Sequence, residues 1–212
     1  MPTFLLCFFV LIASIYFSAL YFEDSGLTCY EAFILSNNTG YYLGGAYVEY
    51  SGLIFNGPVT ISGNKATYSD GYTGGMLFAS PEVSSHSTNV AVSGMYLYEV
   101  GMSTFSSATI NNNYGGGMIM YDSGWIAEGD VTMSGNVNPW DENPGGAVYM
   151  YYDSSWVTYG NTVLSNNKAN STGGAVAFYY ESVWRSVGAV TITNNQANQA
   201  GGGNHLSVSP IQ

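Results

Sequence analysis

The chain has 212 residues, a length that fits one domain, and only 8% of them are charged, against about 25% in an average globular protein. With 3 Lys and Arg against 14 Asp and Glu, its formal charge of −11 excludes a nucleic-acid-binding protein, because so few cations cannot neutralise many phosphates. The 27 glycines and 19 tyrosines, with few strong helix formers and little charge, exclude a helical or a disordered chain, and we expect an all-β protein with many turns.

An apolar run without charges, from Phe4 to Phe22, opens the chain. Its length is typical of a secretion signal or of an uncleaved membrane anchor, and a first core strand is the alternative. We assign residues 1–22 to an apolar signal peptide or anchor and residues 23–30 to a short linker. We accordingly expect a secreted or cell-surface protein that contacts a membrane only through this segment, if the segment is not cleaved.

A six-residue phrase then recurs, for example from Val59 to Asn64 and from Val131 to Asn136. Apolar and polar residues alternate in it, which predicts a short half-buried strand, and Ser, Gly or Asn then stop the strand. If the copies stack, the last Asn of each copy can bond to the Asn above and below it in a ladder of side-chain amides. The expected ladder consists of Asn38, Asn64, Asn113, Asn136, Asn167 and Asn195.

Paired glycines follow each copy after a loop of variable length and supply a bend that only Gly takes without strain. An alternating strand comes after them, and a third strand fits in the remainder of each unit. The structural glycines are Gly44, Gly45, Gly74, Gly75, Gly115, Gly116, Gly145, Gly146, Gly173, Gly174, Gly201 and Gly202.

The intervals between the ladder asparagines are 26, 49, 23, 31 and 28 residues. Units of this length suit stacking of like on like, with neighbouring strands about 4.8 Å apart, better than they suit hairpins. We therefore predict a right-handed parallel β-helix of about six to seven coils over residues 31–212, truncated at its C-terminus in one alternative. The interval of 49 either hides a degenerate turn, with Val90 to Met95 as its candidate phrase, or belongs to one turn that carries an insertion.

This pair of phrases resembles the repeats of the chlamydial polymorphic membrane protein family, in which a GGA[ILV] phrase accompanies an FxxN phrase. Gly145 to Val148 and Gly173 to Val176 match the first phrase, whereas most copies of the second have Ile, Met or Leu in place of Phe. The resemblance covers residues 31–205. It implies a surface-exposed β-helical passenger of a kind that often acts as an adhesin.

A further aligned phrase places tyrosines, then an acid, then a tryptophan at the same point of three units. Stacked coils would bring the carboxylates along one edge, about 5 Å apart. The pattern fits an outward aromatic and acidic stripe that binds a glycan, a partner protein or Ca²⁺, or else a solvated turn with the tryptophans packed beneath it. The stripe would comprise Asp122, Trp125, Tyr151, Tyr152, Asp153, Trp156, Tyr179, Tyr180, Glu181 and Trp184.

These features favour a secreted or cell-surface adhesin or structural binding protein that recognises a cell-surface glycan or protein through the stripe, with no cofactor and no metal. A polysaccharide lyase or glycoside hydrolase of the pectin-lyase-like fold is the alternative, because stacking alone can set two carboxylates at a hydrolase spacing. We assign no catalytic residues and consider an enzyme less well supported.

The third interpretation is ice binding by an outward threonine row, interrupted by Ile34 and Val163. The row consists of Thr60, Thr109, Thr132 and Thr191. Two acceptor sequences for N-glycosylation begin at Asn37 and Asn170. Unpaired strand edges at the ends of an open stack predict end-to-end self-association.

Overall fold

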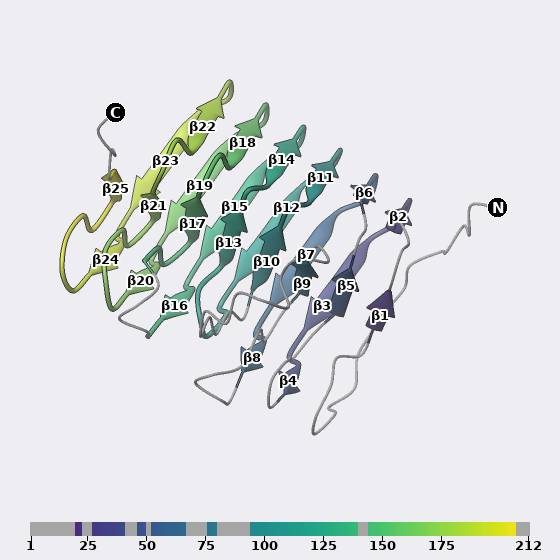
Figure 1. Ribbon diagram of the computed structural model, residues 1–212, viewed down its shortest axis with the longest axis horizontal. Coiled ribbons are helices and arrows are strands. Elements are labelled where there is room, and N and C mark those ends of the chain that lie inside the picture. Colours follow the sequence, from purple (N-terminus) through teal and green to yellow (C-terminus); the bar gives the residue numbers. More distant parts are fainter. Residues whose placement is uncertain are drawn as a thin grey trace.

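The computed structural model describes residues 20–22, 27–40, 46–49, 52–66, 76–79, 94–139 and 144–206. All regular structure in these ranges is β, and every strand pairing is parallel. The expected all-β class is therefore confirmed. Figure 1 shows that equivalent strands of successive passes lie side by side.

Three large sheets and two small ones contain the strands. Sheet A consists of β1 (Leu20–Phe22), β5 (Ala46–Glu49), β9 (Met76–Ala79), β10 (Met95–Tyr98), β13 (Met118–Tyr121), β17 (Val148–Tyr151), β21 (Val176–Phe178) and β25 (Asn204–Leu206). Sheet B consists of β2 (Leu27–Cys29), β6 (Leu53–Phe55), β11 (Gly101–Thr104), β14 (Gly124–Ala127), β18 (Ser155–Thr158) and β22 (Val183–Ser186). Sheet C consists of β3 (Phe33–Ser36), β7 (Val59–Ser62), β12 (Ala108–Asn111), β15 (Val131–Ser134), β19 (Thr162–Ser165) and β23 (Val190–Thr193). The small sheets contain β4 (Thr39–Gly40) with β8 (Lys65–Ala66), and β16 (Val137–Asn138) with β20 (Lys168–Ala169) and β24 (Gln196–Ala197).

The chain visits sheets A, B and C in this order and then returns to sheet A for the next pass, except at β9 and β10, which both lie in sheet A. Each strand pairs with its equivalent in the next pass, so that like residues lie over like. In sheet C, for example, Thr109 of β12 lies opposite Thr132 of β15. This topology of parallel sheets and no helix in the described residues is consistent with a β-solenoid.

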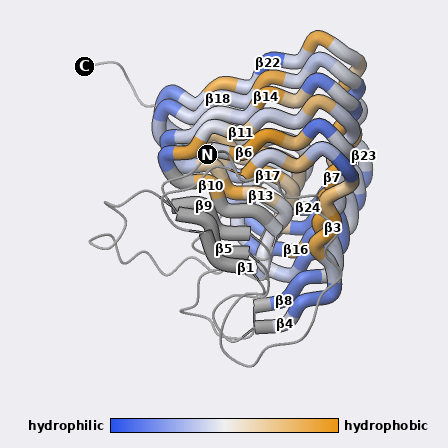
Figure 2. The backbone as a smooth tube through the Cα atoms, turned by 90° about the vertical axis from the view of Figure 1, so that its right-hand side faces the viewer, coloured by the Kyte–Doolittle hydropathy of each residue, from blue (hydrophilic) through white to orange (hydrophobic). Residues whose placement is uncertain are grey.

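The core lies between the inward faces of sheets A, B and C. Burial alternates along the strands, as in β7, where Val59 and Ile61 are buried and Thr60 and Ser62 are partly exposed. This alternation is what a strand with one buried face requires. Figure 2 shows hydrophobic residues along the strands and hydrophilic ones at several of the bends.

The bend after sheet C, which we call the asparagine corner, comprises residues 37–38, 63–64, 112–113, 135–136, 166–167 and 194–195. The second residue of each pair is an asparagine whose Nδ2 donates to Oδ1 of the next one, at 2.9–3.4 Å between Asn38 and Asn195. The backbone N–H of each donates to the same oxygen, so that every Oδ1 after the first accepts two hydrogen bonds. The six asparagines form one continuous ladder inside the bend.

The glycine pairs precede the strands of sheet A. Gly145 has φ 85°, which L-residues with a side chain rarely adopt, and a Cβ on Gly146 would lie 2.2 Å from the carbonyl oxygen of Gly174. The first glycine of a pair thus permits the backbone angle, and the second permits close approach of the next pass. Gly115, Gly116, Gly173 and Gly201 also have positive φ, whereas Gly44, Gly45, Gly74 and Gly75 lie outside the described residues.

The interval of 49 residues belongs to a single pass with an insertion. Asn64 donates directly to Asn113, and β7 pairs directly with β12, whereas sheet A has the additional strand β9 between β5 and β10. Val90 to Met95 is therefore wrong as a copy of the asparagine phrase, because Met95 begins β10 opposite Met118; residues 90–93 lie outside the described part.

The N-terminal assignments also need one correction. Residues 1–19 lie outside the described ranges, and Leu20–Phe22, the end of the apolar run, forms β1 beside β5. The assignment of residues 23–30 to a linker is wrong for Leu27–Cys29, which form β2 because Leu27 and Cys29 are buried in the core. The described part of the chain has no helix long and apolar enough to span a bilayer.

Candidate functional site

The chain passes from sheet A to sheet B through a second bend, which we call the aromatic corner. It comprises residues 99–100, 122–123, 152–154 and 179–182, and it includes the acids of the expected stripe. Asp153 and Glu181 occupy equivalent positions, since Met150 pairs with Phe178. Asp122 lies in a turn that is one residue shorter than that of Asp153.

The backbone of this corner is left-handed at residues that disfavour such angles. Tyr152 and Tyr180 have φ 44° and 43°, and Glu99, Asp122 and Glu181 have φ 51°, 48° and 47°. A positive φ is uncommon for any residue but Gly, and a bulky side chain makes it an outlier that costs about 1–3 kcal/mol. The corner therefore carries backbone strain at its left-handed tyrosines and glutamates, whereas aspartate tolerates this conformation better.

A stack of serines holds this backbone in place. The hydroxyls of Ser123, Ser154 and Ser182 donate back to the carbonyl oxygens of residues 121, 151 and 179, at 2.7, 2.7 and 2.8 Å. Ser123 and Ser154 also accept the backbone N–H groups of residues 100 and 123 from the preceding pass. Sequence reasoning missed these serines, although each follows an acid in the repeated Asp-Ser or Glu-Ser dipeptide.

Tyrosines from three passes cluster beside the acids. The rings of Tyr152 and Tyr180 stack at 4.9 Å between centroids and 17° between planes, and they are 39% and 40% exposed. Tyr151 contacts both edge-on, at 4.3 Å and 5.0 Å. Tyr121 and Tyr179 flank Tyr151 at 5.3 Å and 6.3 Å. The cluster spans three passes, and its exposed stacked pair, Tyr152 and Tyr180, spans two successive passes.

The interior of this cluster stays protonated to unusually high pH. Desolvation by burial, followed by hydrogen bonding with Tyr152 and Tyr180, raises the pKa of Tyr151 well above its ordinary value. Burial, followed by the nearby charges of Tyr152, Asp122 and Glu99, raises the pKa of Tyr121. The phenols of Tyr121 and Tyr151 therefore act as neutral hydrogen-bonding groups at physiological pH.

The tryptophans do not belong to this surface, which corrects the outward stripe. Trp125 and Trp156 are 1% and 0% exposed, and Trp184 packs against the core as a partly buried side chain. Their rings stack inside sheet B at 5.3 Å and 4.7 Å. Each occupies an inward position of its strand, so the alternative, tryptophans packed beneath the turn, is right.

One tryptophan in this stack has an unsatisfied donor. The indole N–H of Trp125 donates to Thr104 Oγ1 of the preceding pass at 3.1 Å. The indole nitrogen of Trp156 is buried without a partner, because Ala127 stands at the position of Thr104. The stack is therefore held by ring contact and core burial more than by its polar atoms.

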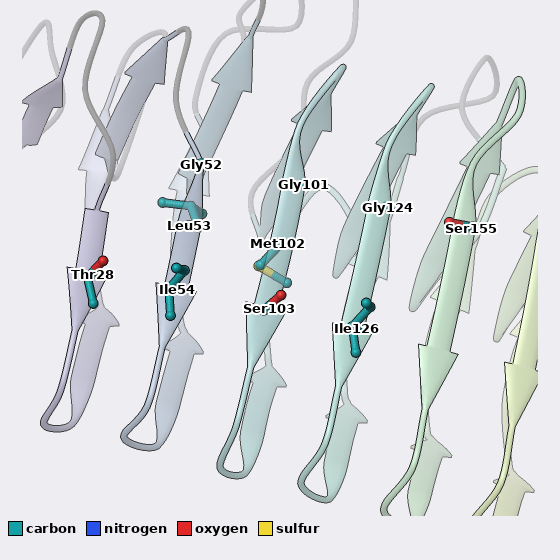
Figure 3. Close-up of a pocket in the computed structure, with 10 residues that line it drawn as sticks. All are labelled: Thr28, Gly52, Leu53, Ile54, Gly101, Met102, Ser103, Gly124, Ile126 and Ser155. Atoms are coloured by element: carbon teal, nitrogen blue, oxygen red, sulfur yellow. The ribbon is translucent and has the colours of Figure 1, made fainter.

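The outer face of sheet B carries a feature that sequence reasoning missed (Figure 3). An open depression of about 490 Å³ is lined there by ten uncharged residues, among them Gly52, Gly101 and Ile126. A Cβ at Gly52 or Gly101 would meet nothing within 4 Å, so these glycines leave the face hollow. The only signal in the sequence was glycine at or just before the first position of several strands.

The outer face of sheet C carries the threonine row. Thr60, Thr109 and Thr132 lie directly opposite one another, and Val163 separates them from Thr191. Ile34 begins the same column. A second column of small polar residues runs beside it: Ser36, Ser62, Asn111, Ser134, Ser165 and Thr193.

The glycosylation acceptors occupy different settings. Asn37 is exposed in the asparagine corner, and the side chain of Asn170 is partly buried and accepts a hydrogen bond from Asn198. No group of three or more His, Cys, Asp or Glu side chains that could hold a metal ion occurs among the described residues. No family model, curated protein or solved structure matches the chain.

Proposed function

We propose that each pass through sheets A, B and C is one coil of a right-handed parallel β-helix. Parallel pairing throughout the described residues and the continuous asparagine ladder support this topology. Right-handed winding is the usual hand of parallel crossover connections. The likeness of the glycine and asparagine phrases to the repeats of polymorphic membrane proteins supports the same fold.

We propose that the protein is a secreted or cell-surface binding protein, not an enzyme, and that the aromatic corner holds a glycan. One observation carries this proposal: Tyr152 and Tyr180 present stacked, partly exposed rings from strained backbone positions, with Asp153 and Glu181 beside them in the chain. Aromatic faces pack on the C–H faces of sugar rings, while phenol and carboxylate oxygens bond to sugar hydroxyls.

The charge of the protein narrows the class of glycan. A formal charge of −11 repels uronates and sulfated chains. Acids in the corner itself favour neutral sugars and, still more, amino sugars with a cationic group. We therefore propose a neutral or amino-sugar polysaccharide as the ligand.

Binding to an array of neutral, amino-sugar and acidic glycans tests this proposal. We expect Tyr152→Ala and Tyr180→Ala each to weaken binding about tenfold, as the loss of roughly 1.4 kcal/mol of ring contact would. Tyr159→Ala is the matched control, because Tyr159 is 48% exposed and lies outside the corner. Preference for acidic glycans, or an equal loss in the control, would contradict the proposal.

The same array separates a binding protein from the polysaccharide-active alternative. We expect Asp153→Asn and Glu181→Gln to weaken binding, with no cleavage of any glycan by the unmodified protein. Cleavage that either substitution abolishes would identify a hydrolase or lyase in place of an adhesin.

Ice binding remains a second candidate because the two outward columns of sheet C lie in register and carry no charge. A flat array of hydroxyls at the strand spacing of about 4.8 Å suits a regular array of water molecules. Thermal hysteresis that Thr109→Lys abolishes would support it, and solutions that freeze without hysteresis would exclude it.

A further inference from the structure

The rings of the stacked pair in the aromatic corner lie close enough, and nearly parallel enough, to react with one another. Tyr152 and Tyr180 lie 28 positions apart in the chain, yet their ring centroids are 4.9 Å apart and their planes almost parallel. Pairing of β17 with β21 before the bend and of β18 with β22 after it fixes this proximity. Both rings are exposed enough to meet an oxidant, at 39% and 40%.

We propose that Tyr152 and Tyr180 are an oxidative cross-linking site, joined as a dityrosine that ties two successive passes of the chain. The oxidant is hydrogen peroxide, used by a haem peroxidase. The enzyme removes one hydrogen atom from each phenol O–H, and the two phenoxyl radicals couple through ring carbons ortho to the oxygens. The hydrogens on these carbons then move to the oxygens, so that two phenols and one peroxide give one biphenol and two waters.

Tyr151 in the cluster and Tyr159 outside the corner are less suited to this coupling. Tyr151 contacts both rings, but edge-on, at 77° and 87°, so that its ring carbons do not face theirs. Burial also keeps its phenol protonated, with a raised pKa. Tyr159 is 48% exposed, but no aromatic ring packs against it among the described residues.

The cross-link would stabilise a protein that is exposed at the cell surface. It closes a loop that contains β18, β19, β20 and β21, and a covalent loop removes conformations from the unfolded chain. A rod exposed outside the cell would then resist unfolding and proteolysis at its C-terminal passes. The cross-link does not depend on a bound glycan, since it needs only the two rings and an oxidant.

Treatment of the full chain with a haem peroxidase and hydrogen peroxide, at low protein concentration, tests the proposal. We expect dityrosine fluorescence, a monomer lighter by two hydrogen atoms, and a proteolytic peptide pair joined through residues 152 and 180. The joined pair is read from the unmodified protein, so the result does not depend on how a variant folds. Dimers without the internal cross-link, or a cross-link between other residues, would overturn the proposal.

Conservative variants give the second readout. Tyr152→Phe and Tyr180→Phe keep a ring in the stack but lack the O–H, and we expect each to abolish the internal cross-link. Tyr159→Phe should leave its yield unchanged. Persistence of the cross-link in Tyr152→Phe would refute the site, whereas failure of glycan binding alone would refute only the proposed function.

Discussion

The asparagine corner and the aromatic corner meet the same backbone requirement with different residues. In the asparagine corner the left-handed position, with φ between 55° and 64°, is always Asn or Gly: Asn37, Gly63, Asn112, Gly135, Asn166 and Asn194. In the aromatic corner the left-handed residues are tyrosines and acids. Asn and Gly adopt this conformation at the lowest cost, so the first bend is built for stability. The second bend keeps strained residues at the surface, and strained positions of this kind cluster at functional sites. For this reason we propose that the glycan binds there.

The asparagine corner also carries the polar framework of the fold. Asn136 is fully buried and satisfies both ends of its amide: Oδ1 accepts from Asn113, and Nδ2 donates to Asn167 and to the carbonyl of Ile110. Hydrogen bonds in such a low-dielectric chain strengthen one another. Losing one member therefore leaves several buried groups without a partner.

The largest expected effect comes from a substitution that interrupts this ladder of hydrogen bonds. Asn136→Leu should lower the free energy of unfolding by about 3–5 kcal/mol, because each buried group left without a partner costs about 1–3 kcal/mol. Urea unfolding followed by circular dichroism measures the loss. The same change at the partly buried last rung, Asn195→Leu, is the matched control and should cost less than about 2 kcal/mol. Equal losses at the two positions would show that the ladder is not a cooperative framework.

The asparagine corner was also the part of the fold that sequence could predict. Few residue types tolerate the left-handed position, and a buried amide at every pass can bond to its equivalents above and below, so that the phrase ending in Asn predicts stacking and register. The paired glycines were readable for a similar reason, since Gly146 stands where no Cβ fits.

The orientation of the aromatic corner could not be predicted in the same way. Inward and outward positions alternate along a strand, so one residue more or less in a bend changes which face follows it. The bend before Trp125 is one residue shorter than the bend before Trp156, yet both rings point inward, and Trp125 lies directly opposite Trp156 in sheet B. The sequence shows the tyrosines, acids and tryptophans together, but only the backbone separates surface from core.

In the asparagine corner, a substitution at the left-handed position should cost stability through the backbone alone. Asn166 is exposed, with φ 56°, so Asn166→Ala changes little except the preference for this conformation. We expect a loss of about 1 kcal/mol in urea unfolding, as Ala is disfavoured in the left-handed region. Asn166→Gly is the control and should stay within about 0.5 kcal/mol of the unmodified protein. If Asn166→Gly lowered the free energy of unfolding as much as Asn166→Ala, the contacts of the Asn side chain, and not its backbone conformation, would be what stabilises the bend.

The corresponding test in the aromatic corner compares two variants that both lose the ring. Tyr152→Asn should be more stable than Tyr152→Ala by about 1 kcal/mol, because Asn tolerates φ 44° better than Ala does. At position 153, which has no positive φ, Asp153→Asn and Asp153→Ala should differ by less than about 0.5 kcal/mol. Equal stability of the two Tyr152 variants would remove the evidence that this bend is strained.

The smallest effect concerns alkaline pH. The pKa of Tyr151 is raised above its unfolded value, so the folded chain holds this proton more tightly and its contribution to stability is complete below about pH 10. Above that pH the unfolded state loses the proton first, and stability should fall as the pH rises. Tyr151→Phe cannot ionise and should lose less stability between about pH 8 and about pH 11, measured by urea unfolding at each pH. Tyr159→Phe should follow the unmodified protein; if Tyr151→Phe follows it too, the partly buried phenol of Tyr151 is not what makes this corner sensitive to alkali.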